Sequence, residues 1–519
     1  MKLFKSFATV GVFTLMSRVL GFVRDILIAA VLGTGPVAEA FVVAFRFPNL
    51  FRRLFAEGAF NSAFIPLFAK RLEGEGHDEA RLFAEQSMAV LIFALIVVTA
   101  LAEIFMPFLM LGMAGGFSDT PDKFDLAVLL TRITMPYLLF VSLLALFSGI
   151  LNAFHKFAAA AAAPVILNLV FIAALASMAM IKLGNTEQAG VALAWAVSIG
   201  GLLQLLVVMV AAKKIGMSLK LRLPRLTPGV KRLLKLGIPG IISGGIVQIN
   251  IVIGTLIASM QDQAVAWLYY ADRLYQLPLG VVGIAIGVVL LPDISRLLRA
   301  GKEEAAHDSQ NRSMEFSLLL TLPAAVALAV VPQPLIQVLF ERGHFSAHDT
   351  QMVGMALLAF AFGLPAFVLT KVFQPGFFAR EDTKTPMYFA TISIAVNIVV
   401  SLALFPFMGH IGIAIATTVA GWMNAGLLWL TLSRRGHYAL DTKARRAIPR
   451  ILFASLLMGG ALYAGLPYLA PWLDRSQPFL VQAAALGTLV MAGVFIYFFI
   501  AALIGAFRIG ALMGKLRRR

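Results

Sequence analysis

The chain has 519 residues, of which 60% are apolar and only 13% are charged, and its formal net charge is +17. Soluble domains carry nearer a quarter charged residues, so this composition excludes a soluble globular protein and indicates a polytopic membrane protein. The chain contains no cysteine, which excludes disulfides, thiol catalysis and thiolate metal sites.

Most of the sequence divides into apolar runs of about 20 residues, each long enough to cross ~30 Å of hydrocarbon. We therefore predict an all-α polytopic membrane protein with about fourteen transmembrane helices. Lys2 and Lys5 precede the first run, but Arg18 interrupts it and no cleavage site follows, so we expect an uncleaved first span. The predicted spans are 7–32, 37–55, 84–111, 126–154, 160–182, 189–212, 233–259, 264–292, 314–340, 351–379, 386–407, 411–433, 447–470 and 478–507.

The positive charge is concentrated in alternate connections and in the C-terminal tail. The connection 213–235, the connection 434–450 and the tail 508–519 are rich in Lys and Arg, whereas the connections on the other side are weakly acidic or neutral. This alternation follows the positive-inside rule and places both termini in the cytoplasm. Topology therefore explains the excess charge, and we expect no nucleic-acid partner.

The first span carries a polar stripe that covers about 120° of a helical face. Arginine at membrane depth is costly unless it faces protein or a water-filled cavity. A guanidinium can donate two parallel hydrogen bonds to a phosphate, so the stripe predicts an enclosed surface for an anion. The alternative is that the arginines are structural charges that pair with the aspartate. The stripe consists of Thr14, Ser17, Arg18, Gly21, Arg24 and Asp25.

In the second span, Glu39 and Arg46 are seven residues apart and share a helix face. A direct pair within the helix is strained at that spacing, so each side chain is expected to contact another helix. Both a gating contact and a substrate contact fit this pattern.

The stretch 52–81 is too charged to span a membrane. Arg52 and Arg53 either reach lipid phosphates or point into a cavity mouth, with Glu57 holding one of them. Apolar residues in this stretch predict a short helix at the cytoplasmic interface. They are Leu54, Phe55, Ala59, Phe60 and Phe64.

A weak internal repeat divides the chain. Six spans separate the copies, which predicts two parallel six-helix lobes, 1–225 and 226–440, followed by two further helices and a basic tail in 441–519. Such an architecture is typical of transporters that bind substrate between the lobes. The matching segments are 44–47 over 271–274, Pro66 over Pro292, and 190–194 over 412–416, at offsets of 227, 226 and 222.

The eighth span carries Arg273 at the repeat position of Arg46, next to Asp272 and on the same side as Tyr269 and Gln276. This position favours a cavity-facing role for Arg273.

No phosphate-binding glycine loop and no HExxH pair is present, so neither an ATP motor nor a metal site is expected. A drug exporter would need buried acids, and an intramembrane enzyme would need an outward-facing catalytic acid. A non-transporting scaffold would not need arginines in a cavity.

Four segments resemble the MviN (MurJ) family of lipid II flippases, within the multidrug/oligosaccharidyl-lipid/polysaccharide exporter superfamily. They are Ser17–Asp25 (SRVLGFVRD), Pro48–Phe60 (PNLFRRLFAEGAF), Trp267–Leu274 (WLYYADRL) and Pro375–Pro386 (PGFFAREDTKTP). The resemblance implies a flippase that moves lipid II, the undecaprenyl-diphosphate-linked disaccharide peptide, to the outer leaflet of the bacterial cytoplasmic (inner) membrane. Such a flippase would serve peptidoglycan synthesis and the maintenance of cell shape.

The resemblance also implies a set of site residues. Glu39 stands where an aspartate is expected, which lengthens its reach. Substrate binding would fall to Ser17, Arg18, Arg24, Arg52, Arg53 and Arg273, and gating or support to Asp25, Glu39, Arg46, Asn49, Glu57 and Asp272.

The partners implied are lipid II, membrane lipids and cell-wall synthesis proteins, and we expect a monomer that is not an enzyme. No cofactor is expected. Without ATP, transport would be coupled to the membrane potential or to a monovalent cation.

Overall fold

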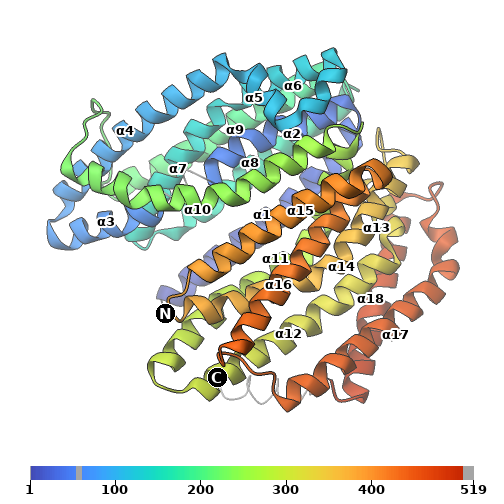
Figure 1. The fold of residues 1–519 in the computed structure, drawn as a ribbon. Helices are drawn as coiled ribbons and strands as arrows, with labels where there is room; N and C mark the ends of the chain where they lie inside the picture. Colours follow the sequence, from blue (N-terminus) through green and yellow to red (C-terminus); the bar gives the residue numbers. More distant parts are fainter. Residues whose placement is uncertain (1, 54–60, 507–519) are drawn as a thin grey trace. The chain divides into compact units, whose positions relative to one another are not determined.

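The computed structural model describes residues 2–53 and 61–506, and the regular structure in these residues is helical (Figure 1). Ten helical segments there are long and apolar enough to cross a membrane, which confirms the all-α polytopic class. The helices are α1 (Lys2–Leu32), α2 (Pro36–Phe51), α3 (Asn61–Gly74), α4 (His77–Ile104), α5 (Met106–Ala114), α6 (Pro121–Thr134), α7 (Pro136–Ala153), α8 (Phe157–Met180), α9 (Glu187–Lys214), α10 (Pro228–Ala258), α11 (Ala264–Arg299), α12 (Glu303–Val330), α13 (Pro332–Phe340), α14 (Ala347–Phe378), α15 (Lys384–Met408), α16 (His410–Arg434), α17 (Thr442–Leu473) and α18 (Phe479–Leu503).

Proline divides three of the expected spans into two helices each. Pro107, Pro136 and Pro332 lie in the first turns of α5, α7 and α13. Proline lacks the N–H that would continue the preceding helix, and its ring clashes with the preceding turn. α4 and α12 both have 28 residues, and α5 and α13 both have 9. The α4–α5 pair runs from residue 77 to residue 114, and the α12–α13 pair runs from residue 303 to residue 340. Corresponding residues are therefore 226 apart, which is one of the offsets of the internal repeat.

The predicted span 37–55 corresponds to α2, which has only 16 residues and ends at Phe51. It is shorter than the ~20 residues that a perpendicular transmembrane helix needs. Three more predicted spans, 7–32, 233–259 and 264–292, are not among the ten candidate membrane helices. They correspond to α1, α10 and α11. The count of fourteen stays a prediction.

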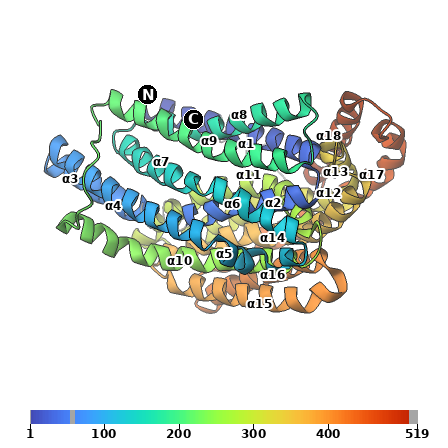
Figure 2. The ribbon, with the colours of Figure 1, turned by 90° about the horizontal axis from the view of Figure 1, so that it is seen from above.

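The chain forms two compact units, and the first comprises Met1–Ala266 together with Arg342–Phe345. α10 thus packs with the first unit, and the predicted lobe boundary after residue 225 stays a prediction. Within this unit α1 lies beside α8 (Figure 2).

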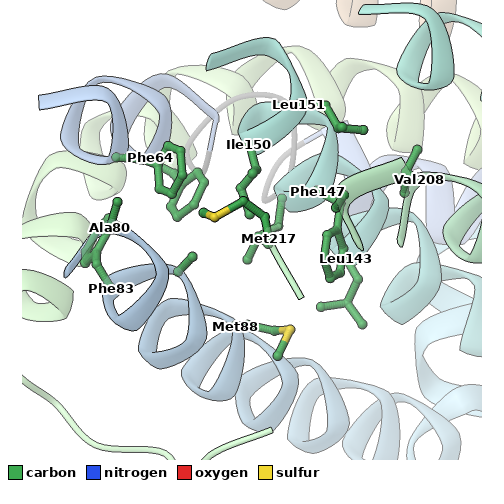
Figure 3. Packing of buried hydrophobic residues seen from close by; sticks show 14 of the residues in the cluster. Phe64, Ala80, Phe83, Met88, Leu143, Phe147, Ile150, Leu151, Val208 and Met217 are labelled. Atoms are coloured by element: carbon green, nitrogen blue, oxygen red, sulfur yellow. The ribbon is translucent and has the colours of Figure 1, made fainter. Parts of the chain in front are cut away.

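Figure 3 shows an apolar core of the first unit, formed by α3, α4, α7 and α9. Phe64 on α3 is fully buried, and its ring lies 5.5 Å from that of Phe68 and 5.7 Å from that of Phe83. Phe64 thus packs inside the protein, on the short helix α3, and the position of this helix at the cytoplasmic interface stays a prediction. The other apolar residues of that prediction, Leu54, Phe55, Ala59 and Phe60, lie outside the described residues.

The end of α1 is held by two other segments of the first unit. The backbone N–H of His344 donates to the carbonyl of Ala30 at 3.0 Å, and that of Asn185 donates to Val31 at 2.9 Å. These bonds satisfy carbonyls that a helix end leaves without partners. Gly33 has φ of 66°, and a Cβ there would lie 2.4 Å from the carbonyl oxygen of His344. Only glycine fits this close approach.

The second unit comprises Trp267–Glu341 and Ser346–Arg519. In it α17 and α18 lie side by side, and α17 packs against α12 (Figure 1). The Tyr497 hydroxyl of α18 donates to the carbonyl of Leu319 on α12 at 2.7 Å.

Between α14 and α15, the carboxylate of Asp382 accepts hydrogen bonds from Thr385 and, at 2.7 Å, from Arg435. Desolvation alone would raise the pKa of Asp382, but these bonds outweigh it and lower the pKa from 3.8 to about 2.

Candidate functional site

Arg24 is the centre of a buried polar cluster on α1. Its Nε and Nη2 donate to Oδ1 of Asp25 at 3.0 and 2.8 Å, and its Nη1 donates to Oδ1 of Asn168 on α8 at 3.0 Å. Arg24 is 9% exposed and Asp25 is 3% exposed. The guanidinium also lies over the rings of Phe45 and Phe171, 5.9 and 5.4 Å from their centroids. The cluster fixes one permanent cation in place among apolar rings.

Ser17 and Arg18 lie one to two turns before Arg24 on the same helix. The amide of Asn168 donates to the carbonyl of Ser17 at 2.9 Å, so one side chain links both ends of the predicted stripe. Arg18 is exposed and has no ion pair with any residue in the described part of the chain. The two arginines therefore differ: Arg24 is held by protein groups, whereas the side chain of Arg18 is exposed.

Glu39 on α2 forms a buried ion pair with Lys123 on α6, whose side chains are 1% and 3% exposed. The backbone N–H of Val265 also donates to Oε1 of Glu39 at 3.1 Å. Lys123 lies 4.2 Å from the centroid of the Phe117 ring and 3.3 Å from Oδ1 of Asp262, which is exposed. The prediction that Glu39 contacts another helix is confirmed.

Arg46 also contacts another helix, as predicted, because its Nη1 donates to Oγ1 of Thr255 on α10 at 3.1 Å. At the end of α2, Nε of Arg52 donates to Oδ1 of Asn49 at 3.0 Å. The Asn49 amide in turn donates to the carbonyl of Phe45 at 2.7 Å. Asn49 thus orients Arg52.

Two further arginines were predicted in the site. Arg53 is exposed at the end of α2, and Glu57, which was predicted to hold either Arg52 or Arg53, lies outside the described residues. In the second unit, the guanidinium of Arg273 lies 4.6 Å from the Tyr269 ring centroid. Asp272 accepts a hydrogen bond from Gln276. The substrate-binding and gating roles of all these residues stay predictions.

Sequence reasoning missed two residues of these clusters, Asn168 and Lys123. Asn168 is a single amide in the otherwise apolar run of α8, and that isolation is the signal that could have identified it. Lys123 falls in the connection between the predicted spans 84–111 and 126–154, but its side chain is buried in the first turn of α6. No local pattern distinguishes it from an exposed lysine. Within the described residues, no three His, Cys, Asp or Glu side chains converge as a metal site.

Comparisons with known proteins agree on one family. The family model described as Lipid II flippase MurJ matches residues 28–482. A probable lipid II flippase MurJ of Rhizobium meliloti (strain 1021) is 51% identical over 519 residues, covering 100% of this chain and 96% of the relative. The corresponding protein of Rhizobium tropici is 49% identical over 520 residues, covering 100% and 97%.

Solved structures extend the comparison to the fold. A structure titled lipid II flippase MurJ, inward closed conformation, has a TM-score of 0.77 at 25% identity and covers 95% of this chain and 98% of that one. An inward-facing multidrug resistance MATE transporter of the MOP superfamily has a TM-score of 0.64 at 15% identity, with 83% and 98% covered, which shows the fold alone. Since the family model and these relatives match nearly the whole length, the chain belongs to the lipid II flippase MurJ family.

Proposed function

We propose that this chain is a lipid II flippase, which moves the lipid-linked peptidoglycan precursor from the inner to the outer leaflet of the bacterial cytoplasmic membrane. The observation that carries the proposal is the match to the family over residues 28–482. The protein is a transporter and not an enzyme. Its work serves peptidoglycan synthesis, and thereby cell-wall growth and cell shape.

The cationic side chains of α1 suit the diphosphate of such a substrate. A diphosphate-linked headgroup cannot enter hydrocarbon unaided, because it would lose its hydration. Guanidinium groups replace that hydration with charge-assisted hydrogen bonds. Arg18 supplies an exposed guanidinium, and Arg24 supplies a fixed positive charge whose position Asp25 and Asn168 determine.

The remaining site residues extend this proposal. Ser17, Arg52, Arg53 and Arg273 bind the headgroup together with the two arginines of α1. Support and gating fall to Asp25, Glu39, Arg46, Asn49, Glu57 and Asp272. The buried pair of Glu39 and Lys123 and the bond from Arg46 to Thr255 support a gating role, because both join separate helices.

The proposed architecture has fourteen spans in two six-helix lobes, 1–225 and 226–440, with two additional helices in 441–519. Both termini lie in the cytoplasm, and the protein works as a monomer by alternating access of the lobes. The matching lengths and offsets of α4–α5 and α12–α13 support the repeat. Cell-wall synthesis proteins are proposed as further partners.

No cofactor takes part in the proposed cycle. The energy comes from the membrane potential or a monovalent cation, and one charge moved through 100 mV supplies about 2.3 kcal/mol. A ligand drives the change of state only through different affinities for the two states.

The test is depletion of the protein in its host, with rescue by variants and an assay of lipid II at the outer leaflet. Arg18→Ala is the sharpest variant, since the side chain has no ion pair among residues 2–53 and 61–506 and the fold should be unaffected. Arg24→Ala and Arg273→Ala should also insert and fail to rescue. Arg81→Ala is the matched control, because Arg81 lies on the exposed start of α4 and its ion pair is with the exposed Asp78. Full rescue by all three site variants would overturn the assignment of these arginines to substrate binding.

A further inference from the structure

Two adjoining cavities lie on the first unit, where the turn between α7 and α8 meets the end of α9. The first has a volume of about 520 Å³ and the second a volume of about 610 Å³. Ala159, Ala211 and Lys214 line both, so the two form one continuous groove. The first is further lined by His155 and Lys156, and the second by Leu206, Val207 and Val210.

The first cavity is cationic. Its lining includes Lys156, Lys214 and His155, and none of the described residues that line it is acidic. His155 has φ of 57°, in the left-handed region, within the tight turn that leads into α8. Lys214 lies in the last turn of α9, where a cation interacts favourably with the helix dipole. This part of the groove is built to attract an anion.

The second cavity is apolar and lies along membrane-spanning helices. α8 and α9 are both long and apolar enough to cross the bilayer. Leu206 is 45% exposed and Val210 is 53% exposed, so the groove opens away from the protein core. Apolar side chains exposed at this depth contact acyl chains and not water. The groove is therefore amphipathic along its length, with a cationic end at the membrane boundary and an apolar end within the hydrocarbon.

We propose that this groove binds one anionic glycerophospholipid of the inner leaflet. Its phosphodiester lies between Lys156 and Lys214, and one acyl chain follows the groove between α8 and α9. The basic connection after α9 places this end on the cytoplasmic side by the positive-inside rule. Lysine ammonium groups act as point charges, which suits a phosphodiester, whereas the planar guanidinium groups of the arginines on α1 suit a diphosphate.

Native mass spectrometry of the detergent-purified full chain tests the proposal, with dioleoyl phosphatidylglycerol as the probe and dioleoyl phosphatidylcholine as the neutral comparison. Phosphatidylglycerol should bind as one retained molecule and phosphatidylcholine should not. Lys156→Gln/Lys214→Gln should weaken this binding about 30-fold, given ~1 kcal/mol for each basic residue near an anionic lipid. The matched control Lys213→Gln/Lys231→Gln removes the same charge from exposed residues outside both cavities and should bind normally.

A second variant tests the apolar end separately. Val207→Trp fills the groove without changing its charge, and it should lower phosphatidylglycerol retention at least tenfold while the thermal midpoint of unfolding stays unchanged. Equal binding of both phospholipids would overturn the proposal, as would an equal loss in the two lysine double variants. Undecaprenyl diphosphate forms a third arm: tighter binding of that lipid to Lys156 and Lys214 would assign the groove to the substrate and overturn the phospholipid assignment.

Discussion

Replacing Lys123 by methionine should destabilise the first unit by about 4 kcal/mol. The substitution keeps the approximate volume but removes the cation that faces the carboxylate of Glu39, and both side chains are almost fully buried. Breaking a buried ion pair costs about 3–5 kcal/mol, because the remaining charge has no compensation. The contact of Lys123 with the exposed Asp262 adds less than about 1 kcal/mol. One N–H donor, from Val265, stays on the carboxylate and moderates the loss.

The assay is equilibrium unfolding in mixed detergent micelles, and the control is Arg81→Met. Arg81 pairs with Asp78 on the surface, with 43% and 89% of their side chains exposed, so this loss should cost less than about 1 kcal/mol. The double variant Lys123→Met/Glu39→Met should recover most of the lost stability, since it leaves no unpaired charge. A cost for Lys123→Met as small as that of Arg81→Met would refute the reasoning, and so would a double variant no more stable than the single one.

Three further predictions concern other contacts. Asn168→Leu should cost about 2 kcal/mol in the same unfolding assay, because the buried Arg24 loses a charge-assisted hydrogen bond; an unchanged midpoint would contradict this. Gly33→Ala should cost at least about 2 kcal/mol, whereas Gly76→Ala, also at positive φ but in open space, should cost about 1 kcal/mol; equal costs would show that the close approach is unimportant. The pKa of Asp382 is lowered from 3.8 to about 2, so its contribution to stability is complete above about pH 4 and is lost as the pH falls toward 2. Asp382→Asn should remove that part of the acid dependence in thermal unfolding, and an unchanged pH profile would count against it.

The sequence predicted the membrane class, and it predicted the contacts of Glu39 and Arg46 with other helices, because these depend on composition and helical spacing. It did not predict the partners themselves. Lys123 and Thr255 come from helices far along the chain, and a pairing of that kind depends on tertiary packing that no local period encodes. Asn168 lies 144 residues from Arg24 for the same reason.

The breaks within predicted spans have a local cause. Hydropathy does not change across Pro107, Pro136 and Pro332, whereas the backbone hydrogen bonds do, so the apolar pattern alone does not locate these breaks. An apolar helix face fits a membrane surface and a protein core equally well, so the sequence did not reveal which neighbours Phe64 contacts. Its stacking against Phe83 depends on the position of α4, which the sequence pattern does not contain.

The docking of Arg342–Phe345 onto the end of α1 has a consequence for biogenesis. The first unit is discontinuous in the chain, so a ribosome completes it only after residues 267–341 have been synthesised. Until then the carbonyl of Ala30 and the surface beside Gly33 lack the loop that covers them. The end of α1 therefore gains this contact only after the chain has been translated as far as residue 345, past the start of the second unit.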